Sequence, residues 1–277
     1  MIGRDVALEA LGALLNANVT THQNVQPAAY PRSGYGGAAP QQLFIKNFIT
    51  TILDADDSCE VSKSNFVRLR RSLQDGAQVV GTAPANYVEI TTVTGRSHFI
   101  DENEFYDPQF DYDFTNLRDT ETYYRGGEVY ERPCGWQRFA LRVLDNYDGN
   151  TWLGTRYRST QSVPGEWPVS YHGTSKAGAE GIIEGFYKPG PGQAYGRGVY
   201  STPFIAEAIP YAKTFTSQKT GKKYQVILQN RINPRYREKH NNGNYWLVPI
   251  AQGTSATEEQ KMVERAIRPY GLLVREV

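Results

Sequence analysis

The chain has 277 residues, a formal net charge of +1 and two cysteines. This length allows one large domain or two small ones with a well-buried core, and two cysteines exclude a disulfide framework or a cysteine-based zinc site. The small net charge provides no positive field for holding phosphate backbones, so a protein is a better candidate partner than a nucleic acid. The scattered histidines His22, His98 and His240 lack metal-ligand spacing, so we expect no metal.

The N-terminal residues predict a short amphipathic helix. Apolar residues recur between Val6 and Leu15, but Arg4, Asp5 and Glu9 interrupt them before a signal-peptide core could form. No run approaches the roughly 20 apolar residues of a membrane span. We therefore expect a cytoplasmic or nuclear protein with no membrane partner, which the low cysteine content also favours.

The amino-acid composition changes twice in the next part of the chain. Residues 20–42 are rich in Pro, Gly, Ala, Gln and Asn, so residues 1–42 are interpreted as a helix followed by a flexible linker. Four short apolar runs then predict strands and a small β-rich region over residues 43–100: Leu43–Ile45, Phe48–Leu53, Phe66–Leu69 and Tyr87–Ile90. Since Gln42–Lys46 resembles the first strand of ubiquitin, a ubiquitin-like unit is one alternative for this region.

The second half of the chain has a steadier pattern. Residues 101–135 are acidic and aromatic at first, as in a connecting segment that wraps a domain surface. Residues 136–277 carry strand signals around Phe139, Val226 and Leu272, and helix starts at Ser175 and at Thr202-Pro203, the second helix shortened by Pro210. This mixture predicts an α+β domain over residues 136–277.

Two motifs in this domain carry the chemistry. Tyr171-His172-Gly173-Thr174 places an imidazole at a strand end beside a glycine, which lets a ligand approach the backbone. Gly196–Pro203 places two glycines before a strand that delivers Tyr200, and Tyr211 follows on the next helix. Each motif by itself is more often structural, as a hydrogen-bonded strand-end histidine or a packed strand and helix.

Taken together, with His172 and Tyr200 28 residues apart, the motifs resemble the catalytic domain of the poly(ADP-ribose) polymerase and diphtheria-toxin group of ADP-ribosyltransferases. The resemblance covers residues 136–277 and implies that family's fold of split antiparallel β-sheets with flanking helices. It implies NAD as the substrate, with His172 at the adenosine-side ribose, Gly173 on the nicotinamide carboxamide, and Tyr200 and Tyr211 on either side of the nicotinamide ring. The neighbouring Thr174 and Ser201 are implied as further NAD-binding residues.

The sequence departs from the family at the third catalytic position. The family's glutamate before a late strand aligns with Asn244, ahead of Tyr245–Gln252, while a competing alignment uses Glu264. An amide can donate a hydrogen bond, but it can neither neutralise positive charge on a ribose nor accept a proton from an incoming hydroxyl. Ala208 stands where the family has the serine that binds the carboxamide.

These features predict an NAD-dependent mono-ADP-ribosyltransferase. It would modify a macromolecular acceptor, release nicotinamide and use His172, Tyr200 and Asn244 as its catalytic residues. The alternative is a catalytically inactive module of the same fold that binds NAD, ADP-ribose or a protein partner. The sequence carries no signal for an oligomeric state.

Overall fold

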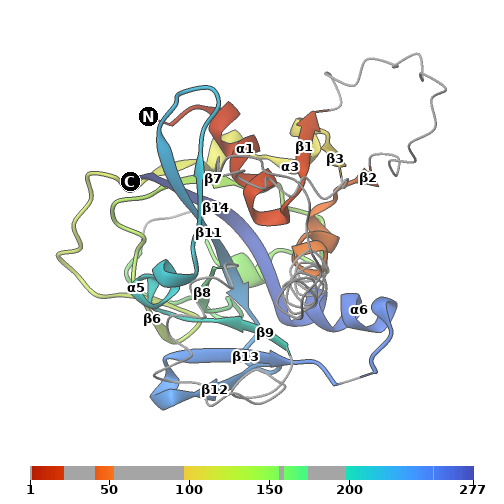
Figure 1. Ribbon diagram of the computed structural model, residues 1–277. Coiled ribbons are helices and arrows are strands. Elements are labelled where there is room, and N and C mark those ends of the chain that lie inside the picture. Colours follow the sequence, from red (N-terminus) through yellow and green to blue (C-terminus); the bar gives the residue numbers. More distant parts are fainter. Residues whose placement is uncertain (1, 22–40, 53–96, 156–158, 174–197, 252) are drawn as a thin grey trace, which may run out of the picture.

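The computed structural model describes residues 2–21, 41–52, 97–155, 159–173, 198–251 and 253–277 (Figure 1). These residues form several mostly antiparallel sheets with a few short helices, so the predicted α+β class is confirmed. In this part of the chain no helix is both long and apolar enough to cross a membrane.

Two ten-residue strands, β11 (Lys223–Ile232) and β14 (Ile267–Glu276), form the middle of the main sheet. They pair antiparallel along their whole length, with a register shift between Gln229 and Asn230. On one side β14 pairs with β7 (Gln137–Ala140), and β7 pairs with β4 (Tyr112–Asp113). On the other edge of β11, β10 (Lys213–Thr216) and β8 (Val169–His172) pair with successive parts of the strand.

Helix α1 (Arg4–Leu15) covers one face of this sheet, as Figure 1 shows. The predicted N-terminal helix is therefore confirmed, and it ends at Asn16, which adopts the left-handed conformation with φ 47°. Its buried side chains share one hydrophobic cluster with the alternating residues of the strands: Val6, Ala7, Ala10, Leu11, Leu14 and Leu15 from the helix, and Tyr224, Val226, Leu228, Leu272 and Val274 from the sheet. Residues on both sides of position 136 thus contribute to one core.

The strands predicted over Leu43–Ile45 and Phe48–Leu53 are wrong for the residues that the structure describes. Residues 45–47 form the 3-10 helix η2 (Ile45–Asn47), and residues 48–52 continue as a helix. The cause is the spacing of Ile45, Phe48, Ile49 and Ile52, which puts these buried side chains on one helical face. The predicted strands at Phe66–Leu69 and Tyr87–Ile90, and with them the ubiquitin-like alternative, lie outside the described residues.

A small parallel sheet lies next to these helical turns. Its order is β1 (Asn18–Thr21), β3 (Ser97–Ile100) and β2 (Gln41–Gln42), with β3 in the middle. The chain then forms α3 (Glu102–Phe105), whose first turn is capped by the Asp101 carboxylate, and η3 (Pro108–Phe110). Phe105 and Tyr106 from this acidic and aromatic segment are buried in the α1 cluster. The segment ends in a hairpin of β5 (Tyr123–Arg125) and β6 (Glu128–Tyr130), and η4 (Thr151–Leu153) follows β7.

A separate antiparallel sheet stands at the other end of the molecule. It consists of β12 (Glu238–His240), β13 (Tyr245–Pro249) and β9 (Gly198–Ser201), with β13 in the middle and η6 (Asn241–Gly243) between β12 and β13. It meets the main sheet at a single antiparallel bridge among the described residues, Tyr171↔Thr202. The amides and carbonyls of this bridge exchange two hydrogen bonds of 2.7 and 3.0 Å.

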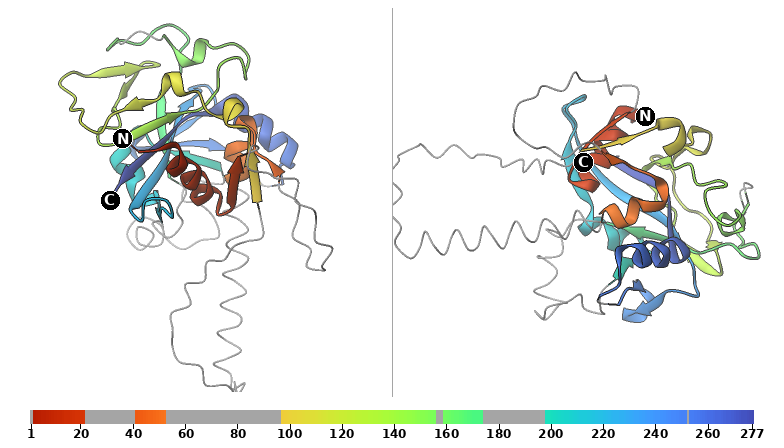
Figure 2. Two further views of the ribbon diagram at one scale, coloured as in Figure 1. Left: turned by 90° about the horizontal axis from the view of Figure 1, so that it is seen from above. Right: turned by 90° about the vertical axis from the view of Figure 1, so that its right-hand side faces the viewer.

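Two helical elements flank this junction. The helix predicted to open at Thr202-Pro203 is confirmed as α5 (Ile205–Ala208) followed by η5 (Ile209–Tyr211), which contains Pro210. Helix α6 (Ala256–Ala266) starts at Ser255, whose side chain accepts a hydrogen bond from the Glu258 amide, and it lies beside η2 in Figure 2. The helix predicted from Ser175 lies outside the described residues.

Candidate functional site

His172 ends β8 and points its ring at the next sheet. Its Nδ1 lies 2.5 Å from the backbone carbonyl of Tyr200 on β9. Because a carbonyl only accepts hydrogen bonds, Nδ1 carries the proton and Nε2 keeps its lone pair. Burial lowers the pKa of His172, and the bond to Tyr200 raises it by less. The imidazole is therefore neutral at pH 7, with Nε2 as an acceptor.

Gly173 follows His172 and lies against the backbone of Tyr211. A Cβ added at Gly173 would lie 2.6 Å from the carbonyl carbon, the carbonyl oxygen and the Cβ of Tyr211. Real atoms do not approach so closely, so the contact between the end of β8 and the end of η5 requires glycine. This contact brings the two sequence motifs together in space.

Tyr200 is half-buried on β9, which pairs with β13 so that Tyr200 faces Leu247 and Ser201 faces Trp246. Side chains alternate along a strand, and the bridge partner Thr202 lies on the same face as Tyr171. Tyr200 therefore shares the face of Tyr171, which is also the face that α5 covers with Ile205 and Ala208.

The other face of β9 carries Ser201, which is buried opposite Trp246 rather than next to the Tyr200 ring. His172 alternates with Tyr171 along β8, so its ring lies on the face opposite to the Tyr171 ring, and its Nδ1 contacts the backbone carbonyl of Tyr200. Thr174 lies outside the described residues. The structure thus brings His172, Gly173, Tyr200 and Tyr211 to one junction and turns Ser201 away from the Tyr200 face.

Asn244 lies immediately before β13. It is half-buried, and its backbone N–H donates to the backbone carbonyl of Asn241 across the turn of η6. The next residue, Tyr245, donates a hydrogen bond of 3.2 Å from its hydroxyl to the Oε2 atom of Glu207 on α5. A carboxylate therefore does lie beside the start of β13, although position 244 does not supply it.

Glu264, the residue of the competing alignment, lies elsewhere. It is on α6, where its carboxylate accepts a 3.0 Å hydrogen bond from Gln260. Helix α6 packs through Val263 and Ala266 on the cluster that contains Val199 and Trp246. Since Val199 alternates with Tyr200, α6 covers the opposite face of β9, and Glu264 is not brought to the Tyr200 ring.

Sequence reasoning did not single out Glu207. The available signal is its position, about one helical turn before Tyr211. The hydrogen bond from Tyr245 is a long-range contact, so no local sequence pattern predicts it.

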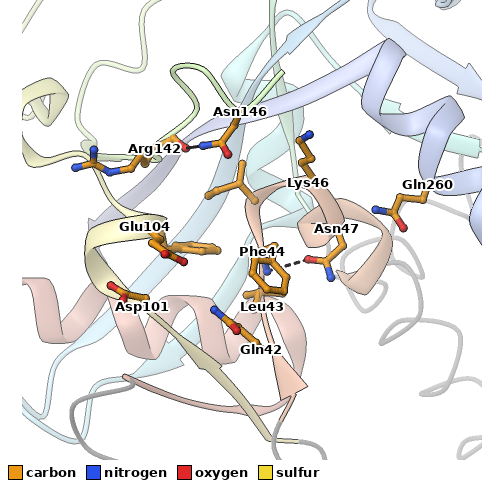
Figure 3. Close-up of a pocket in the computed structure, with 12 residues that line it drawn as sticks. Gln42, Leu43, Phe44, Lys46, Asn47, Asp101, Glu104, Arg142, Asn146 and Gln260 are labelled. Carbon is orange, nitrogen blue, oxygen red and sulfur yellow. Dashed lines mark hydrogen bonds between the residues drawn. The ribbon is translucent and has the colours of Figure 1, made fainter. Parts of the chain in front are cut away.

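A hollow of about 570 Å³ lies apart from this junction (Figure 3). Side chains of both charges line it, Lys46 and Arg142 with Asp101 and Glu104, and none of the site residues named above contributes. Among the described residues no group of three or more His, Cys, Asp and Glu side chains is arranged to hold a metal ion. The residues predicted from the sequence meet at the junction, not in this hollow.

Its groups are suited to holding a flat, polar ring. Tyr200 and Tyr211 are half-buried aromatic residues, Gly173 provides backbone polar groups, and His172 provides an acceptor nitrogen. No protein-family model and no curated protein matches the chain, so the case for a function rests on this geometry and on the sequence motifs.

Proposed function

We propose that this protein is an NAD-dependent mono-ADP-ribosyltransferase with the ADP-ribosyltransferase fold. It transfers ADP-ribose to a macromolecular acceptor, a protein rather than a nucleic acid, and releases nicotinamide. The observation that carries the proposal is the junction of β8, β9 and η5, where His172 touches Tyr200 and Gly173 touches Tyr211.

The arrangement of the strands supports the proposal. The sheet of β12, β13 and β9 stands apart from the sheet of β11 and β14, and the described residues connect the two by the Tyr171↔Thr202 bridge. A split antiparallel sheet with flanking helices is what the resemblance implies. The two motifs come from different sheets, and the bridge between the sheets brings the two motifs close together, which supports the proposal.

The residues at the junction fit NAD. The rings of Tyr200 and Tyr211 would hold the nicotinamide by stacking, and the backbone of Gly173 would bind its carboxamide. The free Nε2 of His172 would accept a hydrogen bond from a ribose hydroxyl. NAD itself supplies the labile bond between ribose and nicotinamide.

An assay with labelled NAD tests the proposal. We expect the purified chain to release nicotinamide and to label an acceptor protein, and we expect His172→Ala to lose both activities. The control is His240→Ala, which alters a half-buried histidine at the end of β12 whose ring contacts the Glu238 carboxylate. The absence of nicotinamide release at any NAD concentration would refute the proposal that this protein is a transferase.

Asn244 gives a specific reason to test the alternative, a catalytically inactive module. Calorimetry separates the two functions, because an inactive module binds NAD or ADP-ribose without turnover. A chain that binds neither compound would contradict both functions.

A further inference from the structure

A carboxylate held by a tyrosine stands next to the proposed nicotinamide site. Glu207, on α5, accepts a 3.2 Å hydrogen bond at Oε2 from the hydroxyl of Tyr245, the first residue of β13. Both residues are half-buried, so the carboxylate is neither sealed in the core nor free in solvent. The bond connects the helix that follows β9 to the strand that pairs with β9.

Strand register puts this carboxylate on the face of the Tyr200 ring. Leu247 is opposite Tyr200, and Tyr245 is two residues from Leu247, so Tyr245 and Tyr200 lie on one face. Glu207 reaches that face because it bonds to Tyr245. The same face is the one that α5 covers.

The helical turns lead to the same placement. α5 and η5 are continuous from Ile205 to Tyr211, so Glu207 and Tyr211 are separated by about one helical turn. The backbone of Tyr211 is in turn fixed against Gly173. Glu207 and Tyr211 thus belong to the helical segment that covers the face carrying Tyr200.

We infer that Glu207, positioned by Tyr245, supplies the carboxylate for the reaction that Asn244 is unable to provide. The inference rests on the proposed function. The acceptor hydroxyl bonds to the ribose carbon as the bond from that carbon to nicotinamide breaks, and the bonding electron pair leaves on the nicotinamide nitrogen. The hydroxyl proton passes to the Glu207 carboxylate and then to solvent. The negative charge of Glu207 also favours the cationic ring of the substrate and the positive charge that develops on the ribose.

Glu207→Gln is the first test, because the amide keeps an oxygen that accepts the bond from Tyr245 but loses the charge and the basic site. We expect nicotinamide release to fall by about 100-fold, the lower end for loss of a general base. The matched control is Glu264→Gln, which removes a glutamate charge from α6 on the opposite face and should leave the rate unchanged. Equal rates for Glu207→Gln and the unaltered protein overturn the assignment.

A second variant separates a catalytic role from a structural one. Asn244 lies directly before Tyr245, so a glutamate at this position returns a carboxylate to the same region. We expect Glu207→Gln combined with Asn244→Glu to recover at least about tenfold of the lost rate, a charge effect of ordinary size at a partly exposed site. A merely structural Glu207 predicts no such recovery.

Binding provides a readout that does not need turnover. NAD⁺ carries a positive charge on its nicotinamide ring and NADH does not, so a neighbouring carboxylate favours the oxidised form. We expect Glu207→Gln to reduce the NAD⁺ to NADH affinity ratio about fivefold in calorimetry, as for the loss of one charge pair in water. An unchanged ratio contradicts the placement of Glu207. If the unaltered protein binds NAD without releasing nicotinamide, the transferase proposal fails while this ratio still tests Glu207. If it does not bind NAD at all, both proposals are overturned.

Discussion

The protonation state of His172 affects both the stability of the fold and the hydrogen bonds that the proposed site can make. Its Nδ1–H donates to the Tyr200 carbonyl, and burial lowers its pKa below the value of about 6.5 that an unfolded chain has. Between these two pKa values the unfolded chain binds a proton and the folded chain does not. Stability from this group is therefore complete above about pH 6.5 and is lost as the pH falls below it.

The pH dependence of thermal unfolding checks this assignment. We expect the melting temperature of the unaltered protein to fall between pH 7 and pH 5 by more than that of His172→Asn. The asparagine amide can still donate to the Tyr200 carbonyl but does not titrate. Parallel curves for the two proteins would show that His172 is not buried as a neutral ring.

Gly173 is the second residue whose chemistry can be tested directly. Gly173→Ala places a Cβ 2.6 Å from backbone atoms of Tyr211, so η5 has to move. We expect a loss of about 1–3 kcal/mol of unfolding free energy, as for overpacking, together with at least tenfold weaker NAD binding. Denaturant titration and calorimetry measure the two effects. Gly3→Ala is the control, since an added Cβ there meets nothing within 4 Å; as the N-cap of α1 it should cost less unfolding free energy than Gly173→Ala and leave NAD binding unchanged.

The residues of the site differ in how far the sequence could predict them. The motifs identified His172, Gly173, Tyr200 and Tyr211 because each occupies a fixed place in a local pattern. The choice between Asn244 and Glu264 required the strand register, since only the alternation of Val199 and Tyr200 assigns α6 to the other face. Glu207 was missed because its contact with Tyr245 joins positions 38 residues apart.

At the level of elements, α1 packs its buried side chains on one face of the main sheet. Leu14 is fully buried against that sheet, whereas Leu8 is only partly buried at its margin. We expect Leu14→Ala to reduce the free energy of unfolding by about 2–5 kcal/mol, the usual range for a leucine in a close-packed core. Leu8→Ala should cost clearly less. Equal losses in denaturant titrations would mean that α1 does not pack as described.

The sequence predicted long, regularly patterned elements better than short apolar runs. The alternation of Tyr224, Val226 and Leu228 and the run Tyr270–Val274 anticipated the middle of β11 and β14, and α1 has apolar residues at helical spacing. The run Phe48–Ile52 fits a strand by composition, but its buried positions fit a helix because they complete a face begun at Ile45. Composition alone does not separate these alternatives in a run this short.

For the whole molecule, the hydrophobic core does not stop at residue 136, where the sequence pattern placed a domain start. Val226, Leu228, Leu272 and Val274 are buried by residues from α1 and from the segment around Phe105. We expect a fragment of residues 136–277 to lack a cooperative thermal transition and to bind a dye for exposed apolar surface, because this face would be uncovered. The full chain should melt cooperatively and should not bind the dye. A fragment that melts cooperatively at the temperature of the full chain would establish 136–277 as an independent domain.

The bridge between Tyr171 and Thr202 is a place where the two sheets can separate locally. Two hydrogen bonds join the sheets at the point where the proposed ligand would lie, and a local opening there needs no disruption of β11 or β14. A molecule bound to His172 on one sheet and to Tyr200 on the other would hold this opening closed. The amide protons of Tyr171 and Thr202 should then exchange with solvent more slowly when NAD is present, while the amides in the middle of β11 remain unaffected. Binding of the proposed substrate would therefore reduce local opening at the contact between the two sheets.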